Sequence, residues 1–400
     1  MIEKGKLNIN QLLSKSFEPL VLDLKTILEE KLIEYDLSRT KVINLLNIDK
    51  NTFDDIINGT AKQPNLFNVI KIIKFLDLDL NEALPGILKN QTRENVASIR
   101  KAENASFIAK NFDIKKLTKV GFFPDTDDVN LLTSRILSFF GFLTIEEYER
   151  KLVTPLYSKT KRTFSDKMKS FWINSAYQCF KNIENPNDYD REAFKDILTK
   201  IRPYCQDVEE GLFTVCKALY NVGVTVIIQN HLTLTQVRGG TFIVNGKPCI
   251  VLTDLNKKYT TIWETLIHES YHVLYDLETI KTTGFHLTGD PDLFLIEEKA
   301  EEFSREYFCG YDDYIYVKPH IHNAFMVERL AKDKEIHLSF IYSSFRQFEK
   351  ILDNKNYYAA FHDFFPEYTQ ALKSLSPITW KESSLETIAK TLKTIFEINV

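Results

Sequence analysis

Cysteine is scarce in this chain, and long apolar runs are missing from it. The five cysteines among 400 residues form no CxxC pair, which argues against a disulfide framework and against a thiolate zinc site. No run approaches the roughly eighteen apolar residues of a membrane span, and the polar N-terminus lacks the apolar core of a signal peptide. A net charge of −4 gives no global sign of nucleic-acid binding. We therefore expect a cytoplasmic protein that does not contact a membrane.

The composition is that of a folded protein with several domains. Hydrophobic residues make up 44% of the chain and aromatic residues 12%, enough for real cores and too many for a disordered chain. A length of 400 residues predicts two or three domains. Most apolar patterns have helical spacing, so we expect a mainly α fold with a small antiparallel β-sheet.

Residues 261–278 carry the pattern with the most chemical content. Apolar residues recur there at three- and four-residue spacing without Gly or Pro, which predicts one uninterrupted helix with one buried face. His268 and His272 are four residues apart, so a helix places both imidazoles on the same side, as a single Zn²⁺ requires. Glu269, next to His268, is placed to accept a proton from a water at such a metal. The apolar positions are Ile262, Leu266, Val273, Leu274 and Leu277.

A third metal ligand is offered by a second helical pattern over residues 295–308. Glu297, 25 residues beyond His272, opens a Glu-x-x-Ala-x-x-Phe run. Two His and one Glu would leave the fourth zinc position open, as a catalytic site needs. A helix that only carries two surface histidines is the simpler alternative, and the third ligand weighs against it. The apolar side of this second helix is expected to hold Leu295, Ala300, Phe303 and Tyr307.

The region from Leu219 to Tyr307 resembles the ImmA/IrrE family of zinc metallopeptidases. That family has a hydrophobic strand, a Thr-x-x-His-Glu-x-x-His helix and a Glu-x-x-Ala-Asn-x-Phe-Ala helix. The matching residues are Ile250-Val251-Leu252, Thr265 through His272, Glu297, Ala300 and Phe303. The resemblance implies a zincin-like α+β core of the gluzincin type. It also implies that His268, His272 and Glu297 are zinc ligands and that Glu269 is the general base.

The resemblance has three departures, and two further residues have open roles. Glu301 replaces the usual Asn, Ser304 the usual Ala, and Asp276 a frequent His. Glu301 lies one turn from Glu297 and is either a partner that orients a ligand histidine or a solvated glutamate. His286, in the loop between the two helices, is either a hydrogen-bond donor to the transition state or an ordinary loop histidine.

Residues 38–59 predict a helix-turn-helix, and residues 1–90 resemble an Xre-type repressor domain over nearly its whole length. Asn47 is suited to a left-handed backbone between two short helices, and Asp49 is suited to cap the second. Lys50 and Asn51 would face outward and could read bases. Asp54 and Asp55 would face outward too and would oppose a phosphate backbone. DNA binding and a protein-binding or dimerising role, including a homodimer, therefore both remain open.

The rest of the chain is assigned by pattern. Residues 91–215 predict a helical connector, residues 216–310 the peptidase-like core, and residues 311–400 a C-terminal helical region. Strands are expected at 224–228, 241–244 and 249–252, with a type I′ hairpin at Asn245-Gly246. We expect an extended substrate to add to the exposed edge of this sheet.

Two functions follow from these patterns. The resemblance implies a regulatory zinc endopeptidase that cleaves a helix-turn-helix repressor under stress and so derepresses an operon. The alternative is a DNA-binding transcription regulator or antitoxin-like protein whose metal domain senses or scaffolds without cutting. The complete set of His268, Glu269, His272 and Glu297 favours the enzyme, because a scaffold has no need of a general base.

The DNA-binding interpretation makes a direct prediction. The chain should shift a fragment of its own promoter in a gel, Lys50→Ala and Asn51→Ala should weaken the shift, and the affinity should fall steeply with salt because phosphate contacts release counterions. Absence of a shift at low salt, together with a stable dimer of residues 1–90, would favour the protein-binding role.

Overall fold

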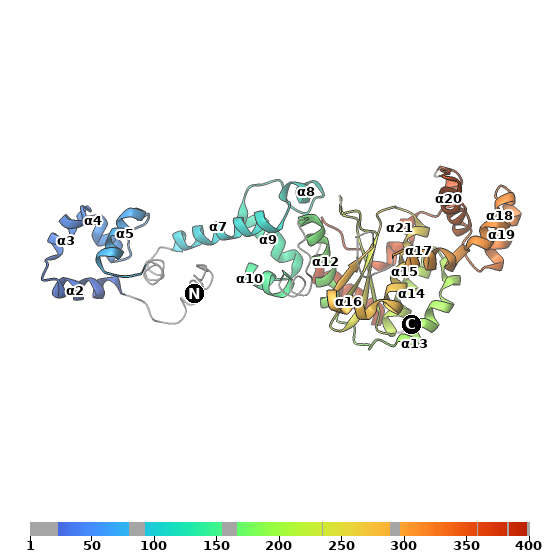
Figure 1. Ribbon diagram of the computed structural model, residues 1–400, viewed down its shortest axis with the longest axis horizontal. Coiled ribbons are helices and arrows are strands. Elements are labelled where there is room, and N and C mark those ends of the chain that lie inside the picture. The colour runs from blue at the N-terminus through green and yellow to red at the C-terminus, as the bar shows by residue number, and fades with distance from the viewer. Residues whose placement is uncertain are drawn as a thin grey trace. The chain divides into compact units, whose positions relative to one another are not determined.

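The structure is a computed structural model, and it describes residues 23–79, 93–153, 166–233, 235–288, 297–357, 359–381 and 384–397. The chain divides into two compact units, residues 1–106 and 107–400 (Figure 1). Each unit is considered by itself below.

The first unit contains the predicted helix-turn-helix. Asn47 ends one helix in the left-handed region, with φ 48° and ψ 58°, and Asp49 accepts a hydrogen bond from the backbone N–H of Thr52 at 3.1 Å. The expected turn and cap are both confirmed. Leu28, Phe53 and Ile72 belong to a separate small core that these helices share. The helices are α2 (Leu24–Glu34), α3 (Arg39–Leu46), α4 (Lys50–Ile57) and α5 (Leu66–Phe75).

The second unit has helices on both sides of one four-stranded sheet. A long helix, α7 (Arg93–Asn111), leads into it across the boundary between the units. The helices before the sheet are α8 (Ile114–Lys119), α9 (Val129–Phe140), α10 (Ile145–Tyr148), α12 (Lys167–Ile183), α13 (Arg191–Lys200) and α14 (Gly211–Asn221). The strands are β1 (Thr225–Gln229), β2 (Gly239–Val244), β3 (Lys247–Thr253) and β4 (Phe285–Leu287). The later helices are α15 (Tyr259–Tyr275), α16 (Leu277–Thr283), α17 (Glu297–Cys309), α18 (Tyr311–Val317), α19 (Ala324–Asp333), α20 (Ser339–Asp353), α21 (Tyr368–Leu372) and α22 (Leu385–Glu397).

The sheet is mixed, so the expectation of an antiparallel sheet was wrong in part. The strand order is β1-β3-β2-β4, and β1 runs parallel to β3 while the other pairs are antiparallel. The predicted hairpin is present, with φ of 52° at Asn245 and 80° at Gly246. The hairpin could be predicted because two adjacent residues, Asn245 and Gly246, determine it. The direction of β1 could not, because it depends on pairing with β3, which follows β1 only after the whole of β2. All five residues of β1 are buried, as is usual for a parallel strand covered on both faces.

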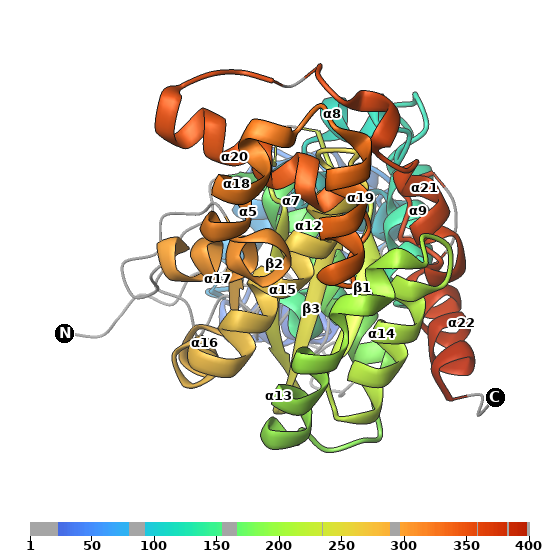
Figure 2. The same cartoon turned by 90° about the vertical axis from the view of Figure 1, so that its right-hand side faces the viewer.

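The two faces of β2 contact different helices. The hydroxyl of Thr241 donates to the carboxylate of Glu269 on α15. The ring of Phe242 packs on the ring of Phe180 on α12, with the two ring centroids 5.7 Å apart. Because successive residues of a strand point to opposite faces, α15 and α12 cover opposite sides of the sheet (Figure 2). The register pairs Thr241 with His286 of β4, so His286 also faces α15.

One continuous core joins the early helices, the sheet and the C-terminal helices of the second unit. Its buried members run from Phe107 to Phe396, and α22 packs closely on α12. Ile378 extends the sheet through a parallel bridge to Gln229 at the end of β1. The division of this unit at residues 215 and 310 stays a prediction.

No single helix in the described part of the chain combines the length and the apolar character that crossing a bilayer requires. The segments Val129–Phe140 and Ile145–Leu152 reach that length and apolar character only when they are taken together, and the two are bent by 43° relative to each other. Most of their large apolar side chains, including Phe139 and Leu152, are packed in the core.

Candidate metal centre

The helix that carries His268 and His272 is shorter and more deeply buried than expected. α15 ends at Tyr275 and α16 begins at Leu277, so the predicted single helix over residues 261–278 is two helices. The break lies at Asp276, where the backbone leaves the helical region with φ −115° and ψ 4°. Most of the circumference of α15 is buried, because the sheet covers one side and α17 another.

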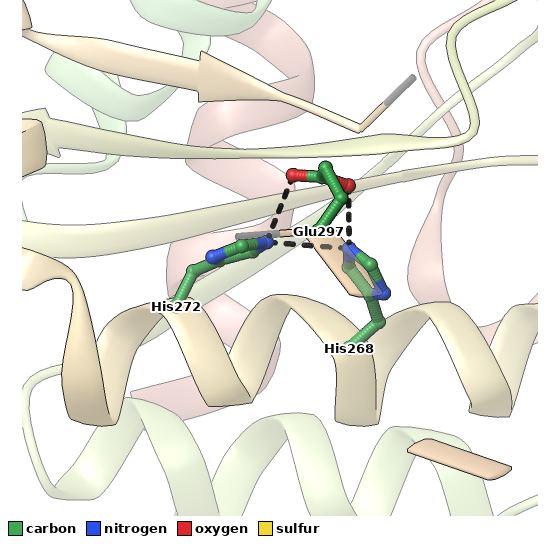
Figure 3. A group of neighbouring side chains, drawn as sticks. All are labelled: His268, His272 and Glu297. Atoms are coloured by element: carbon green, nitrogen blue, oxygen red, sulfur yellow. Dashed lines mark hydrogen bonds and ion pairs between the residues drawn. The ribbon is translucent and has the colours of Figure 1, made fainter. Parts of the chain in front are cut away.

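Three side chains from α15 and α17 converge on one point (Figure 3). The Nε2 atoms of His268 and His272 are 3.2 Å apart. The carboxylate of Glu297 straddles them, with Oε2 3.3 Å from His268 Nε2 and Oε1 3.4 Å from His272 Nε2. Both imidazoles are buried, and the carboxylate is 26% exposed. The three predicted ligands therefore meet as a triangle of side chains, in which each oxygen of Glu297 faces one imidazole.

This triangle fits a tetrahedral metal ion. Metal–ligand bonds of about 2.0–2.1 Å in a tetrahedron place neighbouring ligand atoms about 3.3–3.4 Å apart. The two Nε2 atoms, at 3.2 Å, have that separation, and each Glu297 oxygen lies a similar distance from one of them, at 3.3 Å from His268 and 3.4 Å from His272. Two imidazole nitrogens and one carboxylate oxygen are also the donor set of catalytic zinc sites, and the fourth corner of the tetrahedron would be left to solvent or substrate.

A fourth group, His286, holds Glu297. Sequence patterns placed His286 in a loop, but it lies in the three-residue strand β4, whose identity comes from pairing with β2. Its Nε2 donates to Glu297 Oε1 at 2.6 Å, and the ring is fully buried. Burial opposes ionisation of Glu297, but hydrogen bonds from His268, His272 and His286 outweigh it and hold the pKa of this carboxyl well below its usual range.

Asp276 orients His272, a role that the sequence analysis missed. Its Oδ2 accepts a hydrogen bond from His272 Nδ1 at 2.8 Å, which leaves Nε2 to face the other ligands. Burial lowers the pKa of His272, but the carboxylates of Asp276 and Glu297 outweigh burial and raise it to about 9. The signal was present, because an acid four residues after a ligand histidine lies beside it on a helix.

Glu269 lies beside the cluster and is fully buried. Its Oε2 accepts a hydrogen bond from Thr241 at 2.7 Å, and its Oε1 accepts another from Thr288. β2 passes so close that a Cβ on Gly239 would lie 2.9 Å from Glu269 Oε1 and 2.6 Å from Thr265 Cγ2. A glycine at 239 thus lets the strand approach the helix and bring the Thr241 hydroxyl to the carboxylate.

A cavity of about 450 Å³ opens beside these residues. His268 and Thr288 line it, and so does Glu301. Glu301 forms an ion pair with Arg238 at 3.2 Å, so the orienting contact on a ligand histidine comes from Asp276 instead. The two residues predicted to contact DNA, Lys50 and Asn51, belong to the other unit, where both are exposed at the start of α4.

Comparisons with known proteins add no relative. No family model, no curated protein and no solved structure matches this chain.

The geometry predicts about one Zn²⁺ per chain, held by two imidazoles and one carboxylate. His272→Ala or Glu297→Ala should abolish stoichiometric zinc in elemental analysis, because two remaining ligands hold the ion poorly. Asp276→Ala should keep the site but weaken its affinity by roughly 10–100-fold, the usual cost of losing a group that orients a ligand. The matched control is Glu278→Gln, an exposed acid two residues further on. Stoichiometric metal in a His268→Ala/His272→Ala double variant would place the site elsewhere.

Zinc affinity should also depend on pH. With a pKa of about 9, His272 is protonated at neutral pH in the metal-free protein, and zinc must displace that proton. Affinity should therefore rise with pH by up to about tenfold per unit between 7 and 9, with about one proton released per zinc at pH 7. Asp276→Asn removes the largest of the carboxylate contributions that raise this pKa and should flatten the dependence. Titration calorimetry in buffers of different ionisation enthalpy measures the proton release, and a wild-type affinity that is flat over this range would contradict the assignment.

Proposed function

We propose that the chain is a zinc-dependent endopeptidase with a regulatory role, similar to the ImmA/IrrE peptidases, whose substrate is a helix-turn-helix repressor or a related protein. The observation that carries the proposal is the triangle of His268, His272 and Glu297 with the carboxylate of Glu269 beside it. A structural metal site is usually closed by four protein ligands and requires no adjacent base.

The protein side chains divide the work of peptide hydrolysis. His268, His272 and Glu297 would hold the zinc, which when bound supplies Lewis-acid polarisation of a peptide carbonyl and acidifies a water. Glu269 would take the proton of the attacking water and pass it to the leaving amine. Asp276 and His286 are positioning residues, since each fixes one ligand through a hydrogen bond.

Thr288 lies between the Glu269 carboxylate and the cavity. The Thr288 side chain lines the cavity and donates to Glu269 Oε1, whereas Glu269 itself has no exposed surface. A rotation of the Thr288 hydroxyl away from Glu269 would free that oxygen to accept a proton. Side-chain rotamer changes are fast compared with typical turnover, so this rearrangement need not limit the rate.

A DNA-binding regulator is the second candidate, and one contact in the first unit favours it. Arg39 forms an ion pair with Asp54 at 2.7 Å, with both Nε and Nη2 directed at the same oxygen. The charge of Asp54 is therefore largely compensated within the protein, and its repulsion of a phosphate backbone is reduced. Lys50 and Asn51 remain exposed beside it. This role is compatible with peptidase activity in the second unit.

Glu269→Gln separates the enzyme from the scaffold. The amide keeps the size of the side chain but cannot accept the proton, so proteolysis should fall by about 10²–10⁴-fold. Zinc content should hardly change, because Glu269 is not among the three converging ligands. The measurement is co-expression with a candidate repressor, which is followed by immunoblot.

The control variant is again Glu278→Gln, which should cleave like wild type. Thermal melting of Glu269→Gln checks the fold, since one of the Thr241 and Thr288 hydroxyls can turn to accept from the new NH2 group while the other still donates to the amide oxygen. Loss of the repressor with wild type but not with Glu269→Gln would support the peptidase. Equal regulation of the operon by both proteins, with the repressor intact throughout, would support the scaffold for that target.

A further inference from the structure

Arg238 is anchored directly before β2, close to Glu269. Its backbone carbonyl accepts hydrogen bonds from the backbone N–H of Thr253 at 3.1 Å and from the Thr253 hydroxyl at 2.9 Å. The next residue is Gly239, where an added Cβ would lie 2.9 Å from Glu269 Oε1. The main chain of Arg238 is therefore fixed one residue away from the point where β2 passes beside the Glu269 carboxylate.

The side chain of Arg238 lines the cavity beside the candidate metal centre, together with His268 and Thr288. Its Nη2 donates to Glu301 Oε1 on α17 at 3.2 Å, and the side chain is 42% exposed. Glu301 follows Glu297 by four residues, so the two carboxylates lie one turn apart on the same side of α17. The Arg238–Glu301 pair is thus one helical turn from a candidate metal ligand.

Most of the hydrogen-bond donors of this guanidinium are unused within the described residues. An arginine carries five N–H groups in a rigid planar fork, and only one of those of Arg238 donates to another residue in the part of the chain that the structure describes. Because Glu301 holds one edge of the fork, the remaining N–H groups have fixed directions. The ion pair itself is neutral, so it offers a substrate directed N–H groups and not a net charge.

Peptide hydrolysis uses such donors. The carbonyl oxygen of a peptide bond becomes negative as water attacks the carbonyl carbon, and N–H groups aimed at that oxygen stabilise the transition state more than the substrate. Of the neighbours in the cavity, His268 is a candidate ligand and the Thr288 hydroxyl donates to Glu269. Arg238, in contrast, has N–H groups to spare, and its side chain runs from the strand beside Glu269 to the helix that carries Glu297.

We propose that Arg238 donates a hydrogen bond to the carbonyl oxygen of the peptide bond to be cut, and that Glu301 is a positioning residue that holds the guanidinium for this contact. The inference rests on the proposed peptidase function, which it deepens by naming a further catalytic residue. An acid at 301 suits this role better than the Asn of the ImmA/IrrE pattern, because a carboxylate forms a charge-assisted hydrogen bond with a guanidinium.

The test compares N-phosphoryl-Leu-Trp with Leu-Trp, because the tetrahedral, negatively charged phosphoryl group resembles the carbonyl group in the transition state. Titration calorimetry on the zinc-loaded full chain gives both affinities, and their ratio isolates the contacts with the phosphoryl oxygens. Arg238→Gln should lower this ratio by about 10- to 100-fold, as for the loss of a hydrogen bond between charged groups. Arg238→Lys should recover only part of it, since the charge is kept without the planar fork. Glu301→Gln should lower it severalfold, because the guanidinium is present but held less firmly.

Arg305→Gln is the matched control. It removes the same charge from the same cavity, but Arg305 lies eight residues beyond Glu297 on α17, about two helical turns away, and its guanidinium lies over the ring of Phe348 at 5.8 Å. It should leave most of the ratio intact. Zinc content and melting temperature should stay near wild type in every variant, since Arg238 and Glu301 are both well exposed and an exposed ion pair contributes little stability.

Three results would overturn the proposal. They are a wild-type chain that does not prefer the phosphoryl compound, a wild-type ratio in Arg238→Gln, and equal losses in Arg238→Gln and Arg305→Gln, which would attribute the effect to charge alone. In the co-expression assay, Arg238→Gln should slow loss of the repressor by about 10²–10³-fold with zinc retained. An intact repressor with wild type would reject the proposed function, whereas rapid cleavage by Arg238→Gln would reject only this inference.

Discussion

The site depends on one carboxylate placed among three imidazoles. Glu297 contacts His268, His272 and His286, and so links α17, α15 and β4. A partly buried anion is costly unless it is paired, and the partners that the described residues supply here are three histidines, which can donate hydrogen bonds. The pKa of His272 is raised to about 9, so a proton there would supply part of the positive charge that a divalent cation would bring. Protons and metal compete for the same atoms.

The position of β2 brings this cluster and Glu269 together. The strand must present Thr241 to α15 and Phe242 to α12, which fixes its register, because a slip of one residue would exchange the two faces. Gly239 lets the strand pass within reach of Glu269. The same register pairs Thr241 with His286. The hydrophobic core and the polar site are thus specified together, by alternate residues of one strand.

The features that could be predicted from the sequence are those set by residues close together in the chain. The four-residue spacing of His268 and His272 was sufficient to place both rings together, and Asn47 and Asp49 were sufficient to define the turn before α4. The rest depends on tertiary pairing. His286 lies in a strand only because β2 is beside it, and β1 pairs in parallel with a strand that follows it by about twenty residues. Glu297 is intermediate, since its helix was predictable but its approach to α15 was not.

The short edge of the sheet bears on how a substrate would be recognised. The expectation was that a peptide adds to this edge, yet β4 already pairs with β2 and is only three residues long. A three-residue edge offers about two backbone hydrogen bonds, which is little for an extended chain. The cavity along α15, by contrast, presents side chains from α15, α17 and α20 next to His268. Backbone hydrogen bonds accept almost any sequence, whereas side-chain contacts distinguish one sequence from another, so a peptidase that depended on the cavity would discriminate among its substrates.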